Sequence, residues 1–369
     1  MISAQTFCDE LRDHGIDFVT GVPCSFFSGP ISRLTREGRY FAAPNEGSAL
    51  ALAAGASAAG VGTAVLSQNS GLGNQINPLT SLNMTYRVPT LVFMSLRGWP
   101  DPAGDEPQHA VMGETTMPIL DTLGVAHQVL TPGTTGLKEI LAKSLDVVEQ
   151  GRSAFVLVQR GSIGTEPGEP AAVDEALPTR SEVLRRIVPR FAGLPVIATT
   201  GYTSRDLFAA GDADTHFYMQ GSMGHALSFG LGVALHQPER KPVLVLDGDG
   251  AALMHLGSMS AVGAAAPDNL IHLVFDNRTY ESTGCQLTTS ATTDFAALAL
   301  ACGYATASTC RSVEETEAAL ASALERPGPH FVVAAVAPNR GAAPPRATSA
   351  VSAPEIFTRF AGSMNGTSR

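Results

Sequence analysis

The sequence is poor in aromatic and charged residues, and this scarcity excludes several classes of protein. Aromatic residues make up 6% of the 369 positions and charged residues 16%, with 24 Lys and Arg against 34 Asp and Glu. The formal net charge is −10 and no run of Lys or Arg occurs, which argues against a nucleic-acid-binding surface because phosphate contacts need clustered cations. An anionic ligand must therefore be held by a local pocket.

Cysteine is also scarce, and long apolar runs are lacking. The five cysteines form no CxxC pair and have no metal-ligand spacing, so we expect reduced thiols. The apolar stretches are too short or too interrupted by glycine to cross a bilayer. Residues 1–15 have the pattern of an amphipathic helix, not of a signal peptide. These features predict a cytoplasmic protein that binds neither membranes nor nucleic acids.

What the sequence does contain is a series of short apolar runs that alternate with helix-length segments. Continuous β-branched runs in this arrangement are typical of parallel strands covered on both faces. The runs span residues 17–22, 62–66, 89–95, 154–158, 195–199, 242–246, 270–275 and 330–336.

This pattern predicts an α/β fold with two doubly wound parallel-sheet domains. We place the domains at residues 1–165 and 183–345, joined by a linker at 166–182 that is rich in Gly, Pro and acidic residues. The C-terminal tail, 346–369, should carry a short amphipathic helix at 354–360. In such sheets ligands bind in the loops beyond the carboxyl ends of the strands.

One such loop contains Gly248, Asp249 and Gly250, directly after an apolar strand and before a helix. The glycines allow a tight turn and let backbone N–H groups approach a phosphate at the helix start. Asp249 could then supply a hard oxygen ligand to a diphosphate-bound cation. Taken alone, the pattern is equally consistent with an ordinary turn.

Asn277 follows the next predicted strand, so its side chain and that of Asp249 should emerge at the same sheet edge. A carboxylate, an amide oxygen and a backbone carbonyl suit Mg²⁺; the simpler alternative is two unrelated loops. The pair resembles the fingerprint of thiamine-diphosphate-dependent enzymes, which implies thiamine diphosphate and Mg²⁺ as cofactors. In that family the metal ligands would be Asp249, Asn277 and the carbonyl of Thr279. The resemblance also places Gly248, Gly250 and Ala251 in the cofactor site.

Glu46 stands at the start of an Ala-rich helix, where the helix dipole favours an acidic residue, so capping is the simplest interpretation. In the family that the chain resembles, a Glu at this place hydrogen-bonds N1′ of the cofactor's aminopyrimidine. The ring then takes the imino form, which removes the C2 proton of the thiazolium. The resemblance therefore implies that Glu46 binds the cofactor and is catalytic.

Two further loops match the family. Gly221 would supply a carbonyl to the 4′-amino group, Ser222 would lie beside it, and Met223 would wedge beneath the cofactor. By itself Met223 would be taken for a core residue. Thr200 and Gly201, after a strand, match a second loop on the diphosphate side.

The chain lacks the middle domain of the larger enzymes of this family, and resembles its compact phosphonopyruvate and sulfopyruvate branches. The blocks SGLGN and DEPQH point to the phosphonopyruvate branch. The resemblance implies decarboxylation of a small anionic 2-oxo acid: 3-phosphonopyruvate, giving phosphonoacetaldehyde and CO₂ in phosphonate biosynthesis, or alternatively sulfopyruvate or a similar acid. It also implies a homodimer or homotetramer with the cofactor at the subunit interface.

Ser25, Arg97 and His109 are the candidates for contacts with the substrate carboxylate or phosphonate and for proton transfer. A helix cap, a surface ion pair and a loop histidine, respectively, explain them equally well. Two rival functions stay open. A nicotinamide-dependent dehydrogenase is disfavoured because no GxGxxG follows the first strand. A catalytically silent cofactor-binding subunit is disfavoured because Glu46, Asp249 and Asn277 are all present.

Overall fold

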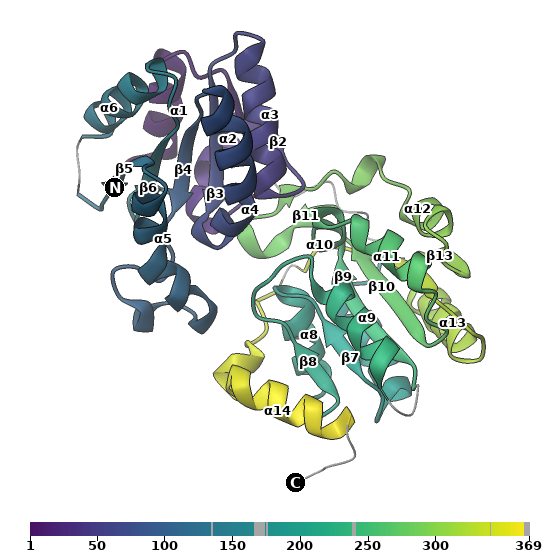
Figure 1. Ribbon diagram of the computed structural model, residues 1–369. Helices are drawn as coiled ribbons and strands as arrows, with labels where there is room; N and C mark the ends of the chain where they lie inside the picture. Colours follow the sequence, from purple (N-terminus) through teal and green to yellow (C-terminus); the bar gives the residue numbers. More distant parts are fainter. Residues whose placement is uncertain (134–135, 166–173, 175, 238–240, 340, 365–369) are drawn as a thin grey trace. The chain divides into compact units, whose positions relative to one another are not determined.

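The computed structural model describes residues 1–133, 136–165, 174, 176–237, 241–339 and 341–364 (Figure 1). Residues 166–173 and 175 of the predicted linker lie outside the described residues. The chain divides into two compact units. The first unit is Met1–Pro170 with Thr283–Gln286, and the second unit is Ala171–Ser282 with Leu287–Arg369. Within the described ranges, none of the helices has both the length and the apolarity needed to cross a membrane.

The first unit is built on a six-stranded sheet in the order β2-β1-β3-β4-β6-β5, in which every pairing is parallel. The strands are β1 Phe18–Gly21, β2 Tyr40–Ala42, β3 Thr63–Gln68, β4 Leu91–Ser95, β5 Ala126–Leu130 and β6 Ala154–Val158. The α-helices are α1 Ala4–Asp13, α2 Ser28–Arg36, α3 Glu46–Ala58, α4 Leu72–Pro78, α5 Ala110–Thr122 and α6 Leu137–Glu149.

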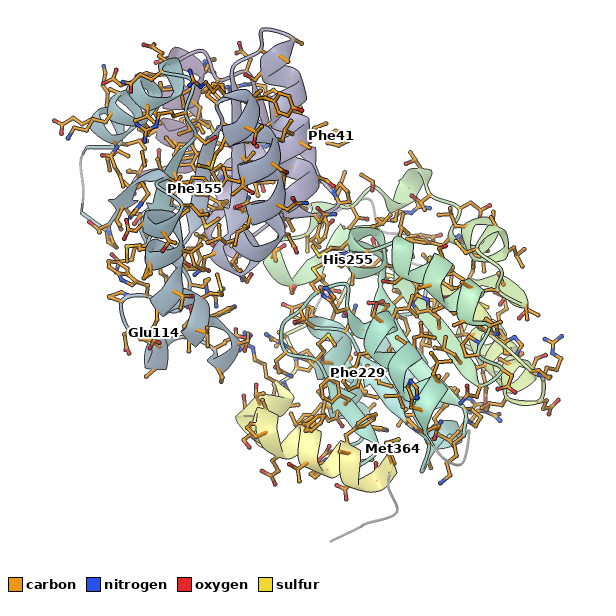
Figure 2. The ribbon with its side chains drawn as sticks, in the orientation of Figure 1. Phe41, Glu114, Phe155, Phe229, His255 and Met364 are labelled. Carbon is orange, nitrogen blue, oxygen red and sulfur yellow. The ribbon has the colours of Figure 1, made fainter. Side chains whose placement is uncertain are left out.

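Side chains on opposite faces of this sheet enter two separate cores. Phe93 of β4 packs edge-on against Phe7 of α1, with ring centroids 4.9 Å apart. Its neighbour Met94 belongs to the other cluster, with Leu50 of α3 and Phe155 of β6, and Figure 2 shows Phe155 inside the first unit. Both faces of the strands are thus buried, which explains their continuous apolar sequences.

The second unit has a six-stranded sheet in the order β13-β14-β10-β9-β7-β8, again with every pairing parallel. Its strands are β7 Val196–Ala198, β8 His216–Tyr218, β9 Val243–Gly248, β10 Leu270–Asp276, β13 Thr306–Cys310 and β14 His330–Ala335. The chain also contains a separate two-stranded sheet formed by β11 Thr279–Tyr280 and β12 Gln286–Leu287. The α-helices are α7 Arg180–Ile187, α8 Tyr202–Ala210, α9 Ala226–His236, α10 Asp249–Met254, α11 Gly257–Ala265, α12 Phe295–Ala301, α13 Val313–Leu324 and α14 Ala353–Met364.

The predicted fold class is confirmed. Each of the eight apolar runs overlaps a strand, and the helix expected at 354–360 lies within α14. In the two six-stranded sheets, the strands that no run predicted are β2, β5, β8 and β13, which are the outer strands. Because all pairings are parallel, the carboxyl ends of the strands in each sheet meet at one edge, where the predicted site residues follow them.

Candidate active site

The carboxyl ends of β9 and β10 bring two predicted metal ligands to neighbouring positions. The strands pair in parallel as far as Gly248 and Phe275, so the residues that follow emerge at the same edge of the sheet. Asp249 is the first residue of α10, and its buried carboxylate accepts a hydrogen bond of 2.5 Å from Thr288 Oγ1. Asn277 directly follows β10 and is also buried. The predicted cofactor residues Gly248 and Ala251 lie at the end of β9 and within α10, respectively.

A chain of polar contacts fixes the orientation of the Asn277 amide. Its Nδ2 donates to Glu281 Oε2 over 2.9 Å, while its Oδ1 accepts from the backbone N–H of Thr279 over 3.0 Å. Glu281 is held by Arg180 Nη2 at 3.0 Å, and Arg180 Nε donates to Asp206 over 2.7 Å. These buried partners determine which side of the amide carries the oxygen, as outer partners of metal ligands commonly do.

The residues at this edge fit a diphosphate-bound Mg²⁺. Burial, together with the nearby charge of Asp276, raises the pKa of Asp249 to about 7, so a bound cation would compensate a carboxylate that is otherwise poorly stabilised. Among the described residues no group of three or more His, Cys, Asp or Glu side chains could hold a metal ion. The available donors are therefore one carboxylate with amide and carbonyl oxygens, which suits Mg²⁺ when phosphate oxygens and water complete the shell. Gly250 is required sterically, because a Cβ there would lie 2.5 Å from Tyr280 Cε1.

A hydrogen bond connects the loop after β7 to the loop after β8. Thr200 Oγ1 donates a hydrogen bond of 2.8 Å to the carbonyl of Gln220. Gly201 precedes α8 with a φ of +90°, a conformation that favours glycine. The two predicted residues of this loop thus stand at the start of a helix, at the same sheet edge as Asp249.

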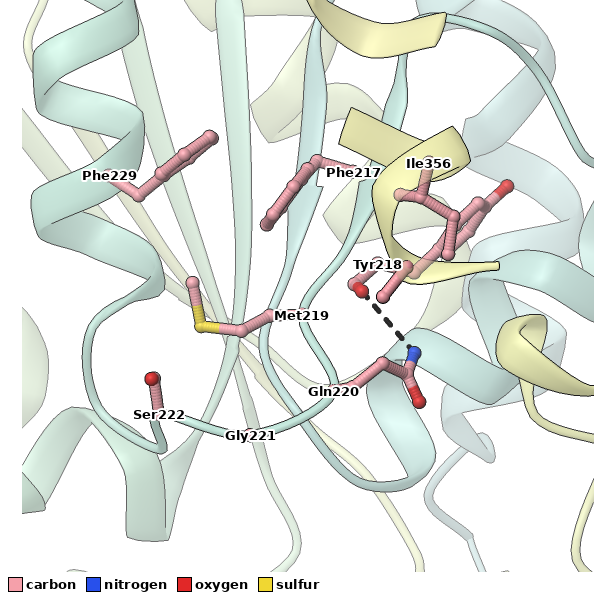
Figure 3. Close-up of a pocket in the computed structure, with 9 residues that line it drawn as sticks. Phe217, Tyr218, Met219, Gln220, Gly221, Ser222, Phe229 and Ile356 are labelled. Atoms are coloured by element: carbon pink, nitrogen blue, oxygen red, sulfur yellow. Dashed lines mark hydrogen bonds between the residues drawn. The ribbon is translucent and has the colours of Figure 1, made fainter. Parts of the chain in front are cut away.

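The predicted loop residues Gly221, Ser222 and Met223 follow β8. Ser222 has a left-handed backbone with φ +50°, so this loop has a tightly defined shape. On one side it borders a pocket of about 230 Å³ between β8, α9 and α14 (Figure 3). The pocket is lined by Phe217, Tyr218, Met219, Gln220, Gly221, Ser222, Phe229, Ala353 and Ile356.

In the first unit, Glu46 is the first residue of α3 and only 6% exposed. Its carboxylate does not cap the helix, because Asn45 Oδ1 accepts the hydrogen bond from the N–H of Ser48. Instead, Glu46 Oε2 accepts from Asn74 Nδ2 over 2.8 Å. A Cβ at Gly71 would lie 2.4 Å from the Glu46 carboxyl, so the small residue leaves room for this carboxylate. Asn45 therefore supplies the hydrogen-bonding cap, while Glu46 lies in the first turn of the helix, where the helix dipole favours an acidic residue.

Two of the three predicted substrate residues converge on one buried carboxylate. Arg97 Nε and Nη2 donate to the two oxygens of Asp105 over 2.7 and 2.6 Å, and His109 Nδ1 lies 3.1 Å from Asp105 Oδ1. Burial alone would raise the pKa of Asp105, but the hydrogen bonds from Arg97 and from two backbone N–H groups hold it well below its usual range. Asp105 is therefore a permanent anion that organises this loop.

The surroundings of His109 favour its neutral imidazole form. Burial, and then the charge of Arg97, lower its pKa. When Nδ1 donates to the Asp105 carboxylate, Nε2 of the neutral ring is an acceptor, 3.4 Å from Gln68 Nε2. Gln68 Oε1 in turn accepts from the thiol of Cys24. His109 Nε2 can thus accept a hydrogen bond or a proton.

Ser25 opens the short 3₁₀ helix η1, Ser25–Phe27, and is half-buried. The next residue, Phe26, lies beneath the guanidinium groups of Arg97 and Arg160, whose Cζ atoms are 5.3 and 5.7 Å from the ring centroid. Ser25 is therefore in the same region as the Asp105 cluster, which we define as Arg97, Asp105, His109 and Arg160.

Comparison with known proteins agrees with this geometry. Residues 206–334 match the family model described as the C-terminal TPP-binding domain of thiamine pyrophosphate enzymes. The chain is 39% identical to the phosphonopyruvate decarboxylase of Streptomyces viridochromogenes, over 98% of this chain and 94% of the relative. It is 40% identical to that of Streptomyces hygroscopicus, over 93% of this chain and 90% of the relative. Sulfopyruvate decarboxylase subunit beta of Methanothermobacter thermautotrophicus is 38% identical, over 51% of this chain and 96% of the relative.

The chain belongs to the phosphonopyruvate decarboxylase family. It is therefore a carboxy-lyase whose cofactor is thiamine diphosphate, as the GDG and Asn pattern predicted. The region that matches the thiamine pyrophosphate model contains the loop at 221–223 and the predicted metal ligands.

Within this family framework, sequence reasoning missed three residues. No local sequence pattern marks Glu281 and Arg180, which orient Asn277, because these two residues are distant in sequence and meet only in the folded chain. The position of Arg160 could have marked it as a candidate, since it follows an apolar run at the carboxyl edge of the sheet. It was missed because Arg160 and Arg97 are far apart in sequence, so their contact with the same carboxylate cannot be predicted locally.

Proposed function

We propose that this chain decarboxylates 3-phosphonopyruvate to phosphonoacetaldehyde and CO₂, with Mg²⁺ as the metal. The observation that carries the proposal is the similarity to two phosphonopyruvate decarboxylases across nearly the whole length of both chains. The sulfopyruvate relative matches only about half of this chain, which makes sulfopyruvate the second candidate substrate.

The residues of the second unit are suited to holding the cofactor. Asp249, Asn277 and the carbonyl of Thr279 would bind the metal, with Glu281 orienting Asn277. The backbone around Gly250 would approach the diphosphate, because this position has no room for a side chain. Thiamine diphosphate, when bound, supplies an electron sink for the carbanion left by loss of CO₂.

In the first unit, Glu46 is suited to holding and moving the proton at N1′ of the aminopyrimidine. Its carboxylate is buried, is not used as a helix cap, and is fixed by Asn74. General acid–base catalysis by such a positioned group contributes roughly 10²–10⁴-fold to rate.

The Asp105 cluster would contact the carboxylate and phosphonate groups of the substrate. His109 offers a neutral Nε2 that can accept a hydrogen bond from the substrate or move a proton, and Ser25 offers a hydroxyl in the same region.

We further propose a homodimer or homotetramer in which Glu46 of one protomer serves a metal site of its partner. The support is the family resemblance and a relative whose name describes it as a subunit. Light scattering after size-exclusion chromatography tests this, and a fully active species with the mass of one chain would contradict it.

The decisive experiment is to incubate the purified chain with thiamine diphosphate, Mg²⁺ and, in separate reactions, phosphonopyruvate, sulfopyruvate and pyruvate. We expect CO₂ and phosphonoacetaldehyde from phosphonopyruvate at a kcat/KM above those of the other two acids. Reactions without thiamine diphosphate, or with a chelator, serve as controls. Preference for sulfopyruvate would support the second candidate, and absence of CO₂ from every acid would refute decarboxylation.

A further inference from the structure

Arg160 stands directly beyond the end of β6, at the carboxyl edge of the sheet in the first unit. Its Nη2 lies 3.0 Å from Asp105 Oδ1, and 58% of its side chain is exposed. The strand order places β6 beside β4, so Arg160 and Arg97 extend from neighbouring strands toward the same carboxylate. The fold thus places a second, more accessible guanidinium beside the one predicted from sequence.

The charge of Arg97 is already balanced within the protein. It binds both oxygens of Asp105, and its Nη2 lies 3.9 Å from Glu106 Oε1. Only 12% of its side chain is exposed. Recruiting Arg97 to a substrate would break a paired, two-point contact and leave the Asp105 carboxylate less well compensated. Its geometry is that of a residue that positions Asp105.

Arg160 differs from Arg97 in each of these respects. It approaches Asp105 with one nitrogen, so the rest of its planar guanidinium can still donate hydrogen bonds. Phe26 lies under its Cζ at 5.7 Å, and this contact restricts the guanidinium without consuming its donors. A guanidinium that is both oriented and exposed is suited to two-point binding of a phosphonate.

We propose that Arg160 is the specificity-determining residue that binds the second anionic group of the substrate, whereas Arg97 is a positioning residue that holds Asp105. This inference rests on the proposed function, because it assigns the part of the substrate that distinguishes phosphonopyruvate from pyruvate. The overall charge of −10 makes such a local cation necessary, since the field of the whole chain repels a multiply charged anion.

The test compares Arg160→Gln and Arg160→Lys with Arg152→Gln in the thiamine-diphosphate- and Mg²⁺-loaded enzyme. Arg152 is a matched control because it is also exposed and lies at the opposite end of the same strand. Steady-state kinetics with phosphonopyruvate and with pyruvate give kcat and KM separately. Calorimetric titration with phosphonoacetate, which carries a carboxylate and a phosphonate on a chain one carbon shorter and has no keto group, measures binding without turnover.

For Arg160→Gln we expect kcat/KM for phosphonopyruvate to fall roughly 100-fold, mainly through KM, as removal of a charge-assisted contact predicts. The affinity for phosphonoacetate should fall by a similar factor, while kcat/KM for pyruvate changes less than about 3-fold. Arg160→Lys should recover part of the loss, and Arg152→Gln should match the unmodified enzyme.

Two results would overturn the inference: phosphonopyruvate kinetics that are unchanged in Arg160→Gln, or an equal loss for phosphonopyruvate and pyruvate, which indicates a structural role. Failure of the unmodified enzyme to release CO₂ from phosphonopyruvate is a different outcome. It would refute the proposed function before Arg160 is considered.

Discussion

Glu281→Ala is the most informative single substitution for the metal half of the site. The Glu281 carboxylate accepts hydrogen bonds from Arg180 Nη2 at 3.0 Å, Asn277 Nδ2 at 2.9 Å and the N–H of Asn339 at 2.8 Å. Glutamine could keep its oxygen at the Oε2 position, which both Arg180 and Asn277 contact, whereas alanine removes both oxygens. All three contacts are therefore lost, together with the negative charge.

The size of the effect follows from the surroundings of Arg180. This side chain is buried, which by itself lowers its pKa, and the charges of Glu281 and Asp206 raise the pKa beyond its ordinary value. Breaking a buried ion pair costs about 3–5 kcal/mol. Because Arg180 keeps its 2.7 Å contact with Asp206, we expect a loss near the lower end, about 3 kcal/mol of unfolding free energy. Loss of the contact that orients Asn277 should weaken Mg²⁺ binding by roughly 10–100-fold.

Urea denaturation followed by circular dichroism measures the first effect, and calorimetric Mg²⁺ titration with thiamine diphosphate present measures the second. Glu317→Ala is the control, because Glu317 also pairs with two arginines, Arg186 and Arg190, but these are 61% and 47% exposed. This control should leave the Mg²⁺ affinity unchanged and change the unfolding free energy little. If Glu281→Ala behaves like this control, the proposed orientation of Asn277 is wrong.

Three further predictions address the rest of the molecule. Glu46→Gln should still bind thiamine diphosphate in calorimetry but lose about 10²–10⁴-fold in kcat for CO₂ release; near-full activity would refute its catalytic role. Gly250→Ala should lower the unfolding free energy by about 1–3 kcal/mol in urea, because the new Cβ lies 2.5 Å from a Tyr280 ring atom. Gly248→Ala, whose Cβ would have no neighbour within 4 Å, is its control, and equal stability of the two would contradict the steric argument. Burial lowers the pKa of His216, so the unfolded state binds a proton at this residue more readily than the folded state. The neutral, buried His216 therefore contributes fully to stability above about pH 6.5, and this contribution is lost as the pH falls below that value. His216→Phe should make the urea midpoint depend less on pH between pH 7.5 and 5.5, and an unchanged pH dependence would refute this role of His216.

The central strands could be predicted because the sequence alone records burial on both faces. β4 and β6 are buried at every position, so they appear as continuous apolar runs. The outer strands could not be recognised in this way. β5 and β13, for example, are mostly half-exposed, and their sequences AHQVL and TASTC mix polar with apolar residues. Their strand identity comes from pairing with β6 and β14, which is a tertiary contact.

The proposed metal ligands could also be placed together from sequence, because adjacent parallel strands bring their carboxyl ends to one edge of the sheet. Asp249 and Asn277 each directly follow such a strand. The role of Glu46 was ambiguous in the sequence, since a Glu in a first helical turn is ordinary. In the structure Asn45 caps the helix and Asn74 contacts the Glu46 carboxylate, which is consistent with the proposed role of Glu46.

The sequence by itself therefore predicted the fold class, through its local periodicity, and the cofactor, through the family that its strand-end loops resemble. It also predicted the sheet edge at which the proposed site residues lie. Only the tertiary structure decided which residues support those positions. Arg180 reaches Glu281 across 101 positions of the chain, and Arg160 meets Asp105 because β6 lies between β4 and β5. Such partners are set by strand order and helix packing, and no local pattern records them.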